Sequence, residues 1–144
     1  FQKKIKIPII SMPKEVYSHA KKNCKKNSKI GILATEATLK TNVYNKFFKR
    51  DFTLIKPKES LQIKNVNKAI KYVKMGKIGK AEKSIKPAIN YLIKMKCRKI
   101  ILGCTELPIA IFAFKSFKKI KLSKIFLDPN LILANVSMKK YNNS

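Results

Sequence analysis

Cys104 is the residue of this sequence best placed for acid–base or nucleophilic chemistry. It stands within ILGCTELPIA (residues 101–110), between a short apolar run and a segment that begins like a helix. Ligands of α/β proteins bind at the carboxyl ends of parallel strands, and the N-terminus of a helix lowers the pKa of a thiol. The position predicts a reactive thiol. Ordinary packing is the alternative, because free cysteine is among the most buried residue types.

Threonines follow two of the predicted strand ends. Thr35 and Thr38 come after the apolar run 30–34, and Thr105 lies in the second turn. Hydroxyls and backbone N–H groups at helix starts bind carboxylates, so both turns are candidate anion cradles. Thr38 is equally suited to be the N-cap of a helix, and the two roles are compatible. Glu106 is expected to stabilise a helix dipole rather than to contact a substrate.

The other thiols, the histidine and the glycines exclude several kinds of site. Cys24 and Cys97 lie outside the two turns and are expected to be structural; three cysteines without a CxxC spacing predict neither a disulfide framework nor a zinc site. His19 is the only histidine, which excludes a Ser-His triad and a His-rich metal site. GKIGK (76–80) lacks the spacing of a P-loop. Reduced thiols are typical of a cytoplasmic protein.

The net charge of +27 invites a nucleic-acid interpretation. Arg50 and Arg98 are the only arginines, although arginine is the residue that reads bases and phosphates bidentately. The lysine excess is better explained by an AT-rich genome, so no specific nucleic-acid partner is expected. No apolar run has the length of a membrane span, and hydrophobic residues, at 45%, are sufficient for a packed core.

Apolar runs alternate with helical patterns along the chain. Strands are predicted at 6–11, 30–34, 52–55, 99–103 and 125–127. Helices are predicted at 13–26, 38–48, 61–75, 80–96 and 108–114, and from 128 onward. Pro87 is expected to kink its helix or to begin a new one. This alternation predicts a single α/β domain over 1–144, a three-layer sandwich with a parallel sheet, whose carboxyl edge carries both threonine turns.

Four segments resemble the aspartate/glutamate racemase superfamily, in its aspartate-racemase-like branch. ILGCTELP (101–108) is similar to the family's second cysteine signature. IGILATEAT (30–38), with Tyr44, is similar to the family's G-L-L-A-T-x-G-T turn. YVKMG (72–76) is similar to the K-x-G segment, and FLDP (126–129) to the closing strand and helix. The segments come in the family's order and span nearly the whole chain.

The resemblance implies a fold of two similar lobes with the substrate between them, and a mechanism without a pyridoxal cofactor or a metal. One cysteine removes the α-proton of aspartate or glutamate, and a second returns a proton to the opposite face. Cys104 would be one of the two acid/base thiols. Thr35, Thr38 and Thr105 would hold carboxylates, and Lys74 would hold the distal one. Family members are often dimers, which implies a homodimer.

The family's first cysteine, in a C-N-T-x-H stretch, has no counterpart in this sequence. The chain therefore resembles the second lobe with a returning C-terminal segment from about residue 115. Phe1 in place of Met predicts that the sequence begins inside a longer reading frame. Alone, the chain is expected to racemise little or nothing. A vestigial or regulatory module that binds an amino acid without catalysis remains the alternative, followed by a basic nucleic-acid-binding protein.

Overall fold

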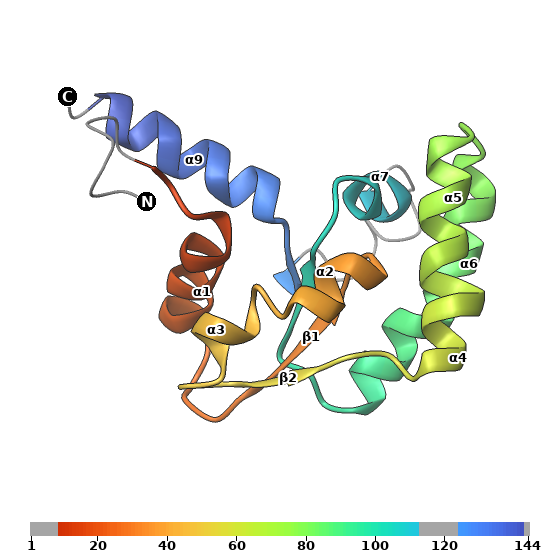
Figure 1. Ribbon diagram of the computed structural model, residues 1–144, viewed down its shortest axis with the longest axis horizontal. Helices are drawn as coiled ribbons and strands as arrows, with labels where there is room; N and C mark the ends of the chain where they lie inside the picture. The colour runs from red at the N-terminus through yellow and green to blue at the C-terminus, as the bar shows by residue number, and fades with distance from the viewer. Residues whose placement is uncertain (1–8, 113–123, 143–144) are drawn as a thin grey trace.

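A four-stranded parallel sheet forms the framework of the computed structural model, which describes residues 9–112 and 124–142 (Figure 1). The strands are β1 (Lys29–Leu33), β2 (Thr53–Ile55), β3 (Lys99–Leu102) and β4 (Phe126–Leu127). Their order is β2-β1-β3-β4, and every neighbouring pair is parallel. In the central pair, Leu33 is opposite Leu102, so β1 and β3 end side by side.

Helices cover both faces of the sheet. They are α1 (Met12–Asn23), α2 (Glu36–Thr41), α3 (Asn45–Phe48), α4 (Glu59–Leu61), the π-helix η2 (Gln62–Asn67), α5 (Lys68–Lys74), α6 (Ile78–Lys94), α7 (Glu106–Phe112) and α9 (Pro129–Asn142). In Figure 1, α1, α3 and α9 lie on one side of the sheet, and α5, α6 and α7 on the other. The predicted three-layer α/β sandwich is confirmed.

The strands read as continuous apolar runs because alternate side chains enter two different cores. Ile32 and Ile101 point into the core beneath α1 and α9. Leu33, Ile100 and Leu102 point into the core beneath α5, α6 and α7. All five side chains are 3% exposed or less. β1 and β3 are thus packed on both faces, which fixes where their carboxyl ends lie.

Several elements differ from their predicted bounds. The predicted strand 6–11 is absent over its described part, residues 9–11, and its first residues lie outside the described ones. The predicted helix 38–48 is two helices, α2 and α3, because Asn42 adopts the left-handed conformation (φ 51°) between them. The predicted helix 80–96 begins at Ile78 and runs without a break through Pro87.

Two further predictions fall partly outside the described residues. Helix α7 accounts for the prediction at 108–114 up to Phe112. The returning segment predicted from about residue 115 is described from residue 124, where it forms β4 and α9. Across the described ranges, no helix combines the length and apolar character that crossing a bilayer requires.

Candidate active site at the carboxyl edge of β1 and β3

The carboxyl ends of β1 and β3 form the point where the strand order reverses. After β1 the chain crosses to β2 on one side, and it later returns to β3 on the other side. Open parallel sheets bind ligands beside such a switch point. The turn with Thr35 follows β1 and the turn with Cys104 follows β3. The prediction that both turns share one edge is therefore confirmed.

The two turns touch through Gly103. Its amide donates a hydrogen bond to the carbonyl oxygen of Leu33 (2.7 Å). A Cβ atom on Gly103 would lie 2.9 Å from the Cβ of Ala34 and 3.4 Å from the Leu33 carbonyl oxygen. Carbon atoms do not approach so closely without displacing each other, so a residue without a side chain is required for this contact.

Cys104 is half-buried and packs against the core beneath α5, α6 and α7. Burial raises the pKa of its thiol to about 11. The amides of Glu106 and Leu107, at the start of α7, hydrogen-bond to the sulfur and act to lower that pKa, as the sequence predicted, but burial outweighs them. In this chain Cys104 is a protonated thiol near neutral pH.

Glu106 connects the side chains of this turn. Its carboxylate accepts hydrogen bonds from the Cys104 thiol and from the Thr105 hydroxyl (Oγ1 to Oε2, 3.2 Å). Lys74 Nζ, at the end of α5, lies 3.5 Å from Glu106 Oε1. Burial acts to raise the pKa of Glu106, yet the hydrogen bonds and Lys74 together lower it. Glu106 is therefore an ionised acceptor, with contacts beyond the predicted dipole role.

Lys74 is connected to the candidate site through its ion pair with Glu106. Its side chain is 65% exposed, and its ammonium reaches the turn of Cys104 because α5 packs beside α7. Because the lysine is exposed and its Nζ lies 3.5 Å from the carboxylate, this ion pair holds Lys74 only weakly. The ammonium is thus free to exchange one carboxylate partner for another at small cost.

In the β1 turn, Thr35 rather than Thr38 is the N-cap of α2. The Thr35 hydroxyl oxygen accepts a hydrogen bond from the Thr38 amide (3.2 Å) and lies 3.0 Å from the Thr38 hydroxyl. The predicted cap at Thr38 is wrong by three residues, because the helix begins at Glu36, directly after Thr35. Both hydroxyls nevertheless lie together in the turn.

Gln62 hydrogen-bonds to the backbone of this turn, a contact that was not predicted from the sequence. Its side-chain amide donates to the Ala34 carbonyl oxygen (2.9 Å) and to Asn67 Oδ1 (2.9 Å). Asn67 in turn donates to Glu36 Oε1 (2.6 Å). Gln62 is buried within the π-helix, and its own Oε1 has no hydrogen-bond partner among the described residues. The periodicity of 3.6 residues per turn predicts which side chains of an α-helix are buried. It does not predict the burial of Gln62, because this residue lies in a π-helix.

Tyr44 lies at the same edge of the sheet, in the core on the face opposite to the one that Cys104 packs against. Its ring is buried, and Cε2 lies 3.6 Å from the position of a Cβ on Gly103. Burial, followed by the charge that Cys104 can carry, raises the pKa of the Tyr44 phenol to about 12. A neutral phenol therefore lies close to Gly103 and Cys104 at this edge of the sheet.

The other thiols lie apart from this edge. Cys97 is buried in the core beneath α6, where burial raises its pKa to about 11, and Cys24 follows α1. Neither belongs to the two turns, in line with the structural role expected of them. Within the described ranges, no group of three or more His, Cys, Asp or Glu side chains could hold a metal ion.

The chain belongs to the Asp/Glu/Hydantoin racemase family, whose model matches residues 1–135. Among solved structures it is similar to the aspartate racemase of Picrophilus torridus, with 26% identity and a TM-score of 0.65. Its fold is also that of an aspartate racemase homologue from Pyrococcus horikoshii OT3 (20% identity, TM-score 0.72) and of a Yersinia pestis protein of the Asp/Glu racemase type (21% identity, TM-score 0.75).

The chain is shorter than these proteins. The three matches cover 83%, 91% and 93% of this chain but only 47%, 55% and 56% of the solved chains. An uncharacterized protein from the pnlA 3′ region of Pectobacterium carotovorum subsp. carotovorum is 31% identical over 103 residues, which are 72% of this chain and 65% of that protein. This chain thus corresponds to about half of the solved racemase-type proteins.

Proposed function

We propose that this chain is the second lobe of a cofactor-independent racemase for aspartate or glutamate, with Cys104 as one of its two acid/base thiols. The observation that carries the proposal is the place of Cys104 at the switch point, beside the Thr35 turn and under hydrogen bonds from α7. Family membership and the similarity to an aspartate racemase support the reaction class.

Burial and the neighbouring Glu106 carboxylate keep Cys104 protonated, which suits it to be the proton donor. A thiolate on the other lobe would take the α-proton and become a thiol, leaving negative charge on Cα and the carboxylate. The Cys104 S–H bond would then break toward Cα on the opposite face, and the sulfur would become a thiolate. The α7 amides that hydrogen-bond to the sulfur stabilise that thiolate. In the reverse direction the two thiols exchange roles.

The substrate carboxylates would be held by groups already directed to this edge. Thr35 and Thr38 present their hydroxyls at the start of α2, and Thr105 presents one at the start of α7. Lys74 would hold the distal carboxylate by exchanging its weak contact with Glu106 for one with the substrate. These cationic and hydroxyl groups would also favour the charge that develops on the α-carboxylate.

The test follows both racemisation of aspartate and glutamate and incorporation of solvent deuterium at Cα by the full-length gene product. Cys104→Ala should reduce racemisation by at least about 100-fold, the lower range for loss of a general acid or base. Cys97→Ala, which removes a buried thiol of the same core, is the matched control and should retain activity. Unchanged racemisation by the Cys104→Ala protein would refute the proposal.

The same assay on the 144-residue chain should show little or no racemisation. A single thiol can remove and return a proton on one face only, which exchanges the α-hydrogen without efficient inversion. Rapid racemisation by the isolated chain would require a second base that the two turns do not supply.

One observation favours a second candidate function, an amino-acid-binding module without catalysis. Burial raises the pKa of the Cys104 thiol to about 11, and the family's first cysteine has no counterpart in this sequence. Calorimetry with aspartate, glutamate and their uncharged amides separates the two. Binding without deuterium exchange in the full-length product would support the module.

A further inference from the structure

Gln62 belongs to a polar network that contacts the chain on both sides of Thr35. Its side-chain amide donates to the carbonyl oxygen of Ala34 (2.9 Å), the residue directly before Thr35. The same amide donates to Asn67 Oδ1 (2.9 Å), and Asn67 donates to the carboxylate of Glu36 (2.6 Å), the residue directly after it. The hydroxyl that caps α2 is therefore anchored to η2 through both of its neighbours in the chain.

The burial of Gln62 costs free energy that an apolar side chain would not cost. The residue is 6% exposed, and its Oε1 has no hydrogen-bond partner among the described residues. A buried acceptor without a donor destabilises the folded state. An apolar residue of similar shape would avoid this cost, but it could not bind the Ala34 carbonyl oxygen or Asn67. A polar group buried at such a cost is typical of a functional position.

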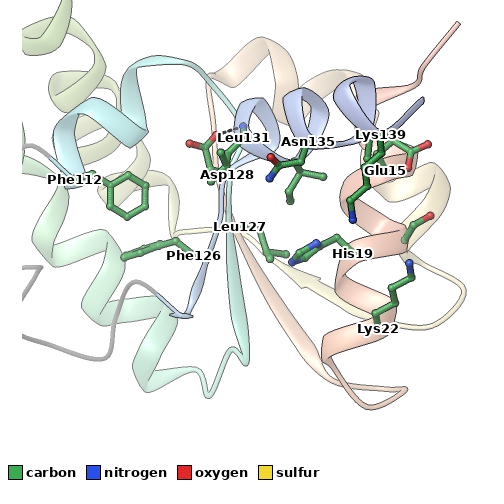
Figure 2. Close-up of a pocket in the computed structure, with 13 residues that line it drawn as sticks. Glu15, His19, Lys22, Phe112, Phe126, Leu127, Asp128, Leu131, Asn135 and Lys139 are labelled. Atoms are coloured by element: carbon green, nitrogen blue, oxygen red, sulfur yellow. Dashed lines mark hydrogen bonds between the residues drawn. The ribbon is translucent and has the colours of Figure 1, made fainter. Parts of the chain in front are cut away.

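Polar side chains elsewhere in the described chain are not in this situation. His19 and Asn135 are exposed and line an open groove of about 540 Å³ between α1, α9 and β4, where water can bind them (Figure 2). The buried charged residues of the described ranges, Asp51 and Glu82, have lysine partners. Neither water nor an ion pair gives such a partner to the oxygen of Gln62.

The helix that carries Gln62 also reaches the thiol turn. η2 continues directly into α5, which packs against α6 and α7 in the core. At the end of α5, Lys74 pairs with Glu106. One continuous helical segment thus contacts the Thr35 turn near its start and the Cys104 turn at its end. Short π-helical segments such as η2 occur frequently at functional sites.

We propose that Gln62 is a positioning residue, which holds the Thr35 and Thr38 hydroxyls where they bind a substrate carboxylate. The inference rests on the proposed function. Both hydrogen bonds of the Gln62 amide go toward the Thr35 turn, to Ala34 and Asn67, so Gln62 acts on carboxylate binding rather than on proton transfer. A carboxylate that is held equally in the ground state and in the transition state governs KM more than kcat.

The test is steady-state racemisation of aspartate and glutamate by the full-length gene product with Gln62→Met. Methionine has a similar length but cannot donate a hydrogen bond. We expect KM to rise at least about tenfold with kcat within about threefold, because small displacements of a binding group have large effects. A KM equal to that of the unsubstituted protein would overturn the proposal.

Asn65→Leu is the matched control, because Asn65 lies in the same π-helix. Its side-chain amide donates to the carbonyl oxygen of Ser84 on α6 (2.9 Å), and the Ser84 hydroxyl donates to the Asn65 carbonyl oxygen (3.0 Å). The substitution removes a comparable hydrogen bond that is directed to α6 instead of the Thr35 turn, so KM should stay within about twofold. An equal rise of KM in both variants would show a purely structural role and overturn the proposal.

Amide hydrogen exchange in the 144-residue chain gives a readout that does not depend on activity. The amides of Thr38 and Leu39 donate to the hydroxyl and carbonyl oxygens of Thr35 (3.2 and 3.0 Å). In Gln62→Met these two amides should exchange at least about tenfold faster than in Asn65→Leu. The amides of β3 should exchange alike in both variants. Unchanged exchange of the two amides would overturn the proposal.

Alkylation of Cys104 separates carboxylate binding from an effect on the thiol. Both variants should leave the alkylation rate at pH 8 within about twofold, and a change confined to Gln62→Met would overturn the proposal. Failure of the unsubstituted full-length product to racemise or to incorporate deuterium would refute the proposed reaction, while amide exchange would still decide whether Gln62 holds the turn. An unchanged KM in a racemising Gln62→Met protein would refute the role of Gln62 alone.

Discussion

The amide of Gly103 donates a hydrogen bond to the carbonyl oxygen of Leu33 across 2.7 Å. This single backbone contact joins the turn that carries Cys104 to the turn that carries Thr35. It extends the β1–β3 ladder one step beyond its last residue pair, Leu33 and Leu102. The spacing between the thiol and the threonine hydroxyls is consequently set by main-chain geometry rather than by flexible side chains.

Replacing Gly103 with alanine should separate the two turns. The added methyl group would lie 2.9 Å from the Cβ of Ala34, so the free energy of unfolding should fall by about 1–3 kcal/mol, as for overpacked interiors. Urea denaturation measures the change. Gly79→Ala is the control, because nothing lies within 4 Å of the added atom at the start of α6. A Gly103→Ala protein as stable as the Gly79→Ala protein would contradict the contact.

The reactivity of Cys104 toward iodoacetamide should rise only at high pH. Alkylation follows the thiolate, and burial raises the pKa of Cys104 to about 11. A raised pKa leaves less thiolate at every pH below it, so the rate at pH 8 should be lower than in urea-unfolded chain. Peptide mass spectrometry resolves the three thiols separately. A midpoint at or below the ordinary thiol value would show that the α7 amides outweigh burial.

Glu106→Gln should shift that profile to lower pH. The Glu106 charge and its acceptance of the thiol proton both raise the pKa of Cys104, so removing the charge makes the thiolate easier to form. Alkylation of Cys104 at pH 8 should become faster. Glu59→Gln in the exposed helix α4 is the control and should leave the rate unchanged. A slower Glu106→Gln protein would reverse the assigned sign.

Thr35→Val should cost about 1 kcal/mol of stability through loss of the α2 cap. Thr35→Ser keeps the oxygen that accepts the Thr38 amide and should restore most of that stability. Thr38→Val should cost less than Thr35→Val, because the Thr38 hydroxyl accepts no amide of α2 in the described contacts. Thermal unfolding of the three proteins orders them. Equal losses at both positions would contradict the assignment of the cap.

The sheet and the edge that carries the candidate site were predictable because they depend on strong patterns. Short apolar runs at 30–34 and 99–103 are typical of strands buried on both faces, and helices between such strands favour parallel pairing. From these two facts the Thr35 turn and the Cys104 turn must end at one edge. The relation between two distant segments thus followed from topology without any contact being known.

Local backbone conformations and the pKa of the thiol were harder to predict from the sequence. The break between α2 and α3 depends on Asn42 adopting φ 51°. Asparagine tolerates this left-handed conformation, but its presence alone does not predict it. The burial of Gln62 follows from a π-turn, and the protonated state of Cys104 follows from the depth of its packing. These features depend on the three-dimensional surroundings of each residue. The residue types alone therefore predicted one continuous helix at 38–48 and a lowered pKa for the Cys104 thiol.

The strand order has a consequence for how the molecule comes into being. The chain completes β1 and the Thr35 turn early, then adds β2 and the whole of α4 to α6 before β3 can insert next to β1. Closing so long an excursion is entropically costly and slows folding. On the ribosome, the Thr35 turn would be synthesised first and would remain without its thiol neighbour until β3 and the Cys104 turn emerge.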